Sequence, residues 1–263
     1  MAVAFATSGD GDGVGVGVGE ITLDNPPANS YDLTVMTEFS QAVDQALESG
    51  ARAVVVRSAS EKFFSAGADV KKFLDGDVES NMRMIRTSQA AFMRMAAAPQ
   101  VFIAHINGHA LGGGLEIALA CDIRLATAGS YKLGTPEVTL GLLPGNGGTQ
   151  RLTRLLGASR AMELLLTGRT FSPAEAHEWG LVAALFEPGE ADQRVREYTE
   201  RFATGPVLAT GAIKRAVHDG AELNLADGLA LEGELIEQLF GTADAAEGLR
   251  AFVEKRKPEF AGA

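Results

Sequence analysis

The sequence is poor in the residue types that several protein classes require. It contains one cysteine, Cys121, so no disulfide can form within the chain. Lys and Arg number 23 against 34 Asp and Glu, which gives a net charge of −11. Nucleic-acid binding without sequence preference needs a basic footprint, which this balance disfavours. No run of 18 apolar residues occurs, so we expect no membrane-spanning helix.

The signatures of several enzyme classes are also missing. There is no Walker A motif, and Ser65 has Phe63 where a G-x-S-x-G elbow needs its first glycine. His105 and His109 are four residues apart but have no cysteine cluster beside them, so we predict no metal site. The N-terminus lacks the basic start and apolar core of a signal peptide. We therefore expect a soluble, cytoplasmic protein in which Cys121 is a buried structural thiol.

What the sequence does contain is an alternation of strand and helix patterns. Apolar residues make up 46%, enough for a substantial core. Short apolar runs predict strands, and apolar residues at helical spacing predict helices. We predict strands at 53–56, 101–106, 123–126, 131–133 and 181–186, and helices at 33–47, 79–97, 149–156, 160–166, 206–218, 225–240 and 242–255. This order favours an α/β core over residues 1–195, followed by a helical segment over 196–263.

The N-terminal region differs in composition from the rest of the chain. Residues 1–13 are small and polar and are expected to be frayed. In Gly13-Val-Gly-Val-Gly-Val-Gly19, glycine and valine alternate, which predicts a strand with one bare face. The G-x-G-x-x-G fingerprint of dinucleotide-binding proteins does not occur in this stretch.

Two glycine turns each follow an expected strand. Gly67-Ala68 follows the strand at 53–56, and Gly112-Gly113 follows the strand at 101–106. Backbone N–H groups at such turns can converge on an oxyanion formed from a carbonyl, because backbone donors are preorganised. Ordinary loops have the same glycines, and the residues alone leave both interpretations open.

Two carboxylates lie at comparable positions. Glu116 is three residues after Gly113 and shares its helix face. Glu137 follows Thr135-Pro136, a sequence typical of an N-cap and first turn. A pair of carboxylates whose pKa values differ can hold a water and transfer protons. Alternatively, both side chains only complement helix dipoles.

Several motifs together resemble those of the crotonase, or enoyl-CoA hydratase/isomerase, superfamily over nearly the whole chain. The motifs are Phe64-Ser-Ala-Gly-Ala-Asp69, Asn107-Gly-His-Ala-Leu-Gly-Gly-Gly-Leu-Glu116, Cys121-Asp122, Pro136-Glu137, Leu143-Pro-Gly-Asn-Gly-Gly-Thr-Gln-Arg151 and Ala251-Phe-Val-Glu-Lys-Arg256. The resemblance implies a spiral of ββα units with a helical C-terminal segment that makes trimer contacts. Asn25-Pro-Pro27 departs from the Asn-Arg-Pro more usual in hydratases of this superfamily.

The resemblance also implies an acyl-CoA ligand and a set of site residues. The oxyanion hole would be the N–H groups of Ala68 and Gly113. Residues expected to contact the substrate are Lys62, Ala66, Asp69, Lys71 and Gly145, with the two lysines near the CoA phosphates. In an acidic chain, the same lysines are equally explained as solvated side chains.

The glutamate pair resembles that of hydratases in this superfamily. It implies an enoyl-CoA hydratase of fatty acid metabolism, in which Glu116 activates water and Glu137 protonates the α-carbon of the substrate. No cofactor is expected, since coenzyme A is part of the substrate, and the expected assembly is a trimer or a dimer of trimers. The alternatives are a 3,2-enoyl-CoA isomerase that uses Glu137 as a single base, another acyl-CoA enzyme of this fold, and a non-catalytic acyl-CoA binder.

Overall fold

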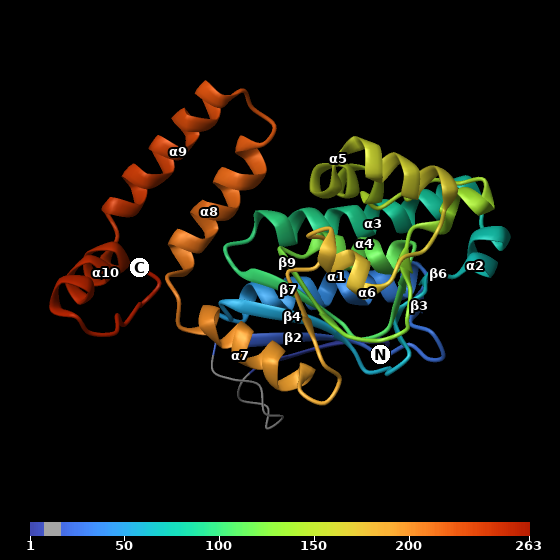
Figure 1. Ribbon diagram of the computed structural model, residues 1–263, viewed down its shortest axis with the longest axis horizontal. Coiled ribbons are helices and arrows are strands. Elements are labelled where there is room, and N and C mark those ends of the chain that lie inside the picture. The colour runs from blue at the N-terminus through green and yellow to red at the C-terminus, as the bar shows by residue number, and fades with distance from the viewer. Residues whose placement is uncertain (8–16) are drawn as a thin grey trace.

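A six-stranded sheet forms the centre of the molecule (Figure 1), a computed structural model that describes residues 1–7 and 17–263. In spatial order the strands are β1 (Val3–Thr7), β2 (Val18–Leu23), β4 (Ala53–Ser58), β7 (Val101–Ile106), β9 (Ile123–Thr127) and β11 (Ala184–Phe186). β1 pairs antiparallel with β2, and all the other neighbours are parallel. The predicted strands at 53–56, 101–106 and 123–126 are confirmed.

The apolar runs are continuous because both faces of the sheet are covered. Along β4, Val54 and Val56 face one hydrophobic cluster and Val55 faces the other. On one side lie α1 (Leu33–Glu48), α3 (Val78–Ala97) and α4 (Gly113–Ala120). On the opposite side lies α7 (Ala191–Ala203), which packs on β2, β4, β7 and β9 (Figure 1) and spans the predicted boundary at 195.

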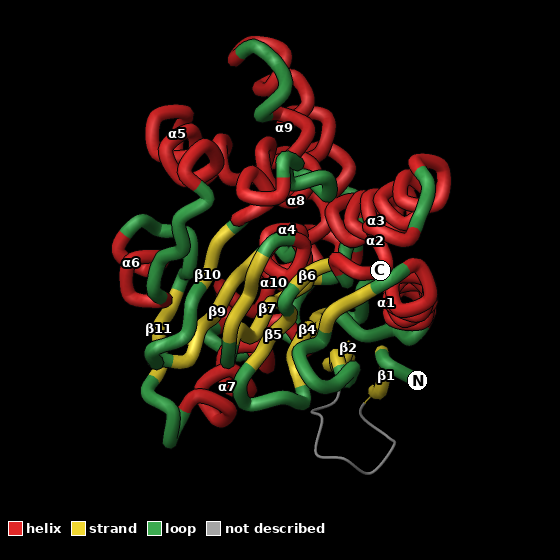
Figure 2. Tube along the Cα trace, turned by 90° about the vertical axis from the view of Figure 1, so that its right-hand side faces the viewer, coloured by secondary structure: helices red, strands yellow, loops and turns green. Residues whose placement is uncertain are grey.

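Short strands follow the long ones and build a second layer (Figure 2). They are β3 (Ser30–Tyr31), β5 (Phe63–Ser65), β6 (Gly67–Ala68), β8 (His109–Leu111) and β10 (Leu133–Gly134). The remaining elements of the body are α2 (Val70–Asp75), the 3₁₀ helix η1 (Pro136–Leu140), α5 (Gly148–Thr167) and α6 (Pro173–Glu178). The order long strand, short strand, helix recurs as β2-β3-α1 and as β7-β8-α4, which confirms the predicted ββα units.

The N-terminal prediction is partly wrong. Residues 3–7 form β1 instead of being frayed, because Val3 is buried against the core and the strand completes the edge of the sheet beside β2. Part of the glycine-alternating stretch at 13–19 lies outside the described residues. Gly17 lies in a turn, and β2 begins at Val18.

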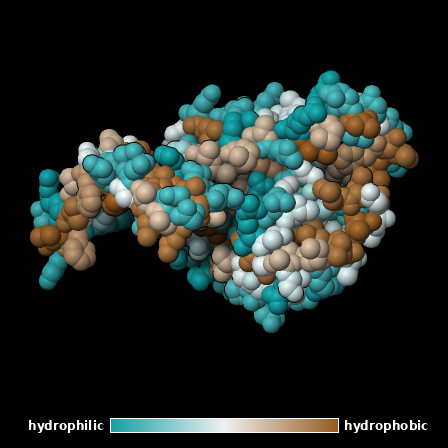
Figure 3. Space-filling model, turned by 90° about the horizontal axis from the view of Figure 1, so that it is seen from above, coloured by the Kyte–Doolittle hydropathy of each residue, from teal (hydrophilic) through white to brown (hydrophobic). Residues whose placement is uncertain are grey.

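Three helices at the C-terminus form an arm that extends from the body (Figure 1). They are α8 (Val207–Gly220), α9 (Leu225–Phe240) and α10 (Ala243–Glu254), close to the predicted spans. Apolar residues gather on the surface of this arm (Figure 3). Large exposed apolar side chains there include Leu225, Leu229, Ile236, Phe240, Phe252 and Val253. None of the described helices is long and apolar enough to cross a lipid bilayer.

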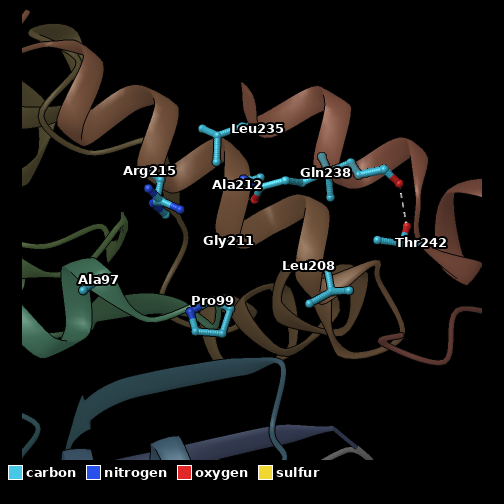
Figure 4. A pocket seen from close by; sticks show the side chains of 10 residues that line it. Ala97, Pro99, Leu208, Gly211, Ala212, Arg215, Leu235, Gln238 and Thr242 are labelled. Atoms are coloured by element: carbon cyan, nitrogen blue, oxygen red, sulfur yellow. Dashed lines mark hydrogen bonds between the residues drawn. The ribbon is translucent and has the colours of Figure 1, made fainter. Parts of the chain in front are cut away.

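An open groove of about 330 Å³ separates the arm from the body (Figure 4). Leu208 and Ala212 of α8 and Leu235 of α9 line one side, and Ala97 and Pro99 of the body line the other. None of the predicted site residues lines this groove. The groove is therefore a gap between the arm and the body, separate from the predicted site.

A buried lysine fastens the arm to the body. Lys214 of α8 donates from Nζ to the carbonyl oxygens of Met95 at 2.9 Å and Gln100 at 2.7 Å. The same Nζ lies 2.9 Å from Oδ2 of Asp122. Because this ammonium group is buried, it requires all three oxygen partners.

Lys214→Met is therefore expected to lower the free energy of unfolding by about 3 kcal/mol, since it leaves the Asp122 carboxylate without its cation. Urea unfolding at neutral pH measures the change. Arg215→Met is the matched control, because this neighbouring side chain is exposed and lies 3.8 Å from Asp219. Equal losses in the two variants would show that Lys214 does not anchor the arm.

Candidate active site

The start of α4 brings groups from three distant segments together. Gly112 has a φ of +53°, and a Cβ at this residue would lie 2.7 Å from Oε1 of Glu137. A Cβ at Gly113 would overlap the hydroxyl of Tyr31. Glycine is required at both positions because a carboxylate and a phenol occupy the space of a side chain.

The second predicted turn lies directly against the first. Gly67 has a φ of +83°, and a Cβ built there would lie 3.0 Å from the backbone nitrogen of Gly113. The N–H of Gly113 is in the first turn of α4 and so has no acceptor within the helix. The N–H of Asp69 donates to the carbonyl of Tyr31 at 2.8 Å. Successive N–H groups of an extended strand alternate in direction, so the N–H of Ala68 points away from Tyr31.

Glu116 is buried within the helix start, with 1% of its surface exposed. Its Oε1 accepts two backbone hydrogen bonds, from Asn146 and from Gly148, both at 2.7 Å. Burial, together with the nearby Glu137, raises the pKa of Glu116 to about 7, although the two backbone donors lower it. The carboxyl group can therefore bind or release a proton near neutral pH.

Glu137 is held differently. It lies in the first turn of η1, and Oε2 is buried with no hydrogen-bond partner among the described residues. Burial raises the pKa of this carboxyl group. The unpaired oxygen next to Gly112 leaves Glu137 able to bind a group that enters the site.

Thr135 does not act as the expected N-cap. In the described structure its side chain makes no capping hydrogen bond, and Oγ1 is buried without a partner. The segment is a 3₁₀ helix that ends at Gly141, whose φ is +73°. The first-turn position of Glu137 is nevertheless as predicted.

Most of the residues expected to contact the substrate lie on both sides of the Gly67-Ala68 turn. Asp69 caps α2, and its Oδ1 accepts from the N–H of Lys71 at 2.9 Å. The N–H of Ala66 donates to the carbonyl of Ala28 at 2.9 Å. Lys62 and Lys71 are exposed. Their contacts with a ligand stay predictions.

Gly145 lies in the loop before α5. Its carbonyl accepts a hydrogen bond from Gln89 of α3 at 2.7 Å, and a Cβ on it would lie 3.2 Å from Ile85. This position places Gly145 one residue before Asn146, whose N–H binds Glu116. Its place beside the acyl group of the substrate stays a prediction.

His109 and Cys121 were not predicted as site residues, and the burial of Cys121 is confirmed. Nδ1 of His109 accepts from the N–H of Lys132 at 3.1 Å, and its ring lies 5.2 Å from that of Phe63. Cys121 is buried, and burial raises the pKa of its thiol to about 12. Both have packing roles.

Tyr31 and Asn146 also lie at this site, although the sequence did not predict it. Tyr31 is 3% exposed, and its Oη accepts a hydrogen bond from Nδ2 of Asn146 at 2.9 Å. Asn146 belongs to the motif at 143–151 but was assigned no role of its own, and Tyr31 belongs to none of the motifs. Tyr31 is brought to Gly113 only by the pairing of β3 with β6.

The spiral of ββα units, with two carboxylates beside a glycine-rich helix start, defines a protein of the crotonase fold. A family model, Enoyl-CoA hydratase/isomerase, matches residues 13–263, and the chain belongs to this family. The resemblance stated from the motifs is thereby confirmed.

Individual relatives match over most of their length. A Rhizobium meliloti (strain 1021) protein named as a probable enoyl-CoA hydratase is 40% identical over 246 residues, covering 91% of this chain and 93% of that protein. A human protein, enoyl-CoA hydratase domain-containing protein 2, mitochondrial, is 40% identical over 249 residues, covering 92% and 85%. The crystal structure of enoyl-CoA hydratase from Bacillus anthracis superposes with a TM-score of 0.92 at 37% identity, covering 100% of both chains.

Proposed function

We propose that this protein is an enoyl-CoA hydratase, which adds water across the double bond of a 2-enoyl-CoA to give a 3-hydroxyacyl-CoA. The observation that carries the proposal is the pair of glutamates, Glu116 and Glu137, which both lie at the start of α4 that Gly112 and Gly113 form. Burial raises the pKa of both carboxyl groups, as acid–base chemistry near neutral pH requires.

The proposed reaction uses the backbone first. The N–H groups of Ala68 and Gly113 donate to the thioester oxygen, withdraw electrons from the double bond and stabilise the enolate. Glu116 takes a proton from water while the water oxygen bonds to C3. Glu137 then gives a proton to C2, and the enolate returns to a thioester. The reaction is redox-neutral, so the proposal includes no cofactor beyond the coenzyme A of the substrate.

The segment around β6 is proposed to hold coenzyme A. Ala66 and Asp69 flank Ala68 and would contact the adenine end, while the exposed ammonium groups of Lys62 and Lys71 would pair with phosphate oxygens. Gly145 would lie beside the acyl chain.

Crotonyl-CoA is the substrate for the first test, followed by loss of the absorbance of the conjugated thioester. Because Glu116 acts as a base and Glu137 as an acid, turnover needs Glu116 ionised and Glu137 protonated, so the pH profile is expected to be bell-shaped. The pKa of Glu116 sets one limb at about pH 7, and the pKa of Glu137, which burial raises, sets the other. Binding of crotonyl-CoA without turnover would instead support an acyl-CoA binder.

An isomerase is the second candidate, favoured by the unpaired Oε2 of Glu137. A single free carboxylate could remove a proton from C2 of a 3-enoyl-CoA and return it to C4. A panel of 2-enoyl- and 3-enoyl-CoA substrates of increasing chain length separates the two reactions. Turnover of 3-enoyl-CoA alone would replace hydration with isomerisation.

The assembly is proposed to be a homotrimer or a dimer of trimers, in a cytoplasmic setting. The exposed apolar side chains of the arm support a subunit interface, since such patches mark association surfaces. Light scattering on the purified protein, which gives the mass of the particle, tests the assembly.

A further inference from the structure

A buried phenol connects parts of the site that come from separate segments. The ring of Tyr31 ends where a side chain on Gly113 would lie. Its backbone pairs with Ala68 between β3 and β6, and its carbonyl accepts from the N–H of Asp69 at 2.8 Å. Tyr31 therefore contacts both segments whose N–H groups form the proposed oxyanion hole.

The hydroxyl of Tyr31 also reaches the loop that holds Glu116. Nδ2 of Asn146 donates to this hydroxyl at 2.9 Å, while the backbone N–H of Asn146 donates to Oε1 of Glu116 at 2.7 Å. Oδ1 of Asn146 is buried and has no partner among the described residues. Among the described residues, Tyr31 is therefore the hydrogen-bond partner that holds the side-chain amide of Asn146.

The phenol stays neutral in this position. Burial raises the pKa of Tyr31 well above its ordinary value, and the two nearby carboxylates, Glu116 and Glu137, raise it further. A neutral hydroxyl that accepts a hydrogen bond from Asn146 is suited to fixing geometry and does not need to exchange a proton.

We propose that Tyr31 is a positioning residue of the active site, which acts through Asn146 to hold the backbone N–H that binds Glu116 and through Gly113 to set the place of the oxyanion hole. The proposal rests on the proposed hydratase function. Without the Tyr31 hydroxyl, the buried Asn146 amide loses its partner, and the loop that carries its backbone N–H is less firmly held. A weaker bond to Glu116 stabilises its carboxylate less, so its pKa rises.

The charged groups that face Glu116 are otherwise unchanged. Glu137 of η1 raises the pKa of Glu116, and Arg151 of α5 lowers it. Nη1 of Arg151 donates to the carbonyl of Asn146 at 2.8 Å, and Tyr31→Phe does not alter either group. A shift in titration of Glu116 therefore reports the loss of the hydroxyl.

The test is a double-mutant cycle on the full chain, with Tyr31→Phe, Asn146→Ala and the double variant. Each single variant is expected to lower kcat for crotonyl-CoA by about tenfold, the effect of one buried hydrogen bond, with little change in KM. The limb of the pH profile that Glu116 sets near pH 7 moves to higher pH. The double variant loses no more than either single one, because both remove the same contact.

Tyr131→Phe is the matched control. It also removes a buried hydroxyl, which lies 2.8 Å from the carbonyl oxygen of Ile106 and 2.6 Å from that of Thr127 and can donate its one hydrogen to either. Melting temperatures of all variants establish that each folds. If Tyr31→Phe matched this control in kcat and pH profile, or if the effects at Tyr31 and Asn146 added fully, positioning through Asn146 would be wrong.

A second measurement separates this proposal from the hydratase proposal. The infrared band of the protonated Glu116 carboxyl, identified by its loss in Glu116→Gln, is titrated in the wild type and in Tyr31→Phe. A midpoint that rises in Tyr31→Phe supports the positioning role even if the wild type hydrates no 2-enoyl-CoA. An unchanged midpoint overturns it, whatever the activity.

Discussion

Glu116→Gln and Glu137→Gln are each expected to lower kcat for the hydration of crotonyl-CoA by about a thousandfold. An amide neither takes a proton from water nor donates one to carbon, while its size is that of the carboxyl group. In Glu116→Gln the amide oxygen can still accept from the N–H groups of Asn146 and Gly148, so the loop before α5 keeps its place. The loss is therefore chemical, and binding of crotonyl-CoA is expected to persist.

Steady-state kinetics on purified variants measure this effect, with Glu79→Gln as the control. Glu79 is an exposed residue of α3, 3.3 Å from Arg86, and its change should leave kcat unaltered. The melting temperature should not fall in Glu116→Gln, because a neutral amide is easier to bury than a carboxyl group that ionises near neutral pH. Activity within tenfold of the wild type in both variants would remove the glutamates from the mechanism.

The long strands could be predicted from the sequence because each is a short apolar run buried on both faces. In β4, Val54 and Val56 pack in one hydrophobic cluster and Val55 packs in the other, so every residue of the run is apolar. The C-terminal helices were predictable for a similar reason, since their apolar residues recur at helical spacing. α9 begins and ends where the sequence places it.

The short strands could not be predicted in the same way. β3 and β6 contain two residues each, too few for any periodicity, and their pairing is set by long-range contacts. β1 was missed for a related reason, because it is an edge strand whose pairing with β2 has no local signal.

Within the site, the sequence predicted groups that lie close together in one segment and missed a contact between distant segments. Glu116 and Gly113 lie one helical turn apart, so their proximity follows from local geometry. Tyr31 and Asn146 meet only because the spiral brings β3 and the loop before α5 to the same helix start. No spacing in the chain encodes that contact.

The contact between Tyr31 and Gly113 gives the second large expected effect. In Gly113→Ala, the new Cβ would overlap the phenol hydroxyl and lie 2.6 Å from Cζ of the ring. Either β3 or the start of α4 has to move; β3 pairs with β6, which carries Ala68, and α4 carries Gly113. We expect kcat/KM for crotonyl-CoA to fall by about a hundredfold or more, as when an oxyanion donor is lost, and the free energy of unfolding to fall by about 2 kcal/mol from overpacking.

Gly233→Ala is the matched control, because a Cβ built there, in the interior of α9, has no heavy atom of the described residues within 4 Å apart from the adjoining residues and the backbone of its own helix. This change should be neutral or stabilising by roughly 0.5–1 kcal/mol. The cause of the Gly113 effect is isolated by repeating Gly113→Ala in a Tyr31→Ala background. The three heavy atoms nearest to the added Cβ all belong to Tyr31, so the stability cost of the methyl group should largely disappear when the ring is absent. If the loss of unfolding free energy remained at its full size in the Tyr31→Ala background, the strain would lie elsewhere in α4. If kcat/KM were unchanged in Gly113→Ala, the N–H of Gly113 would not stabilise the enolate.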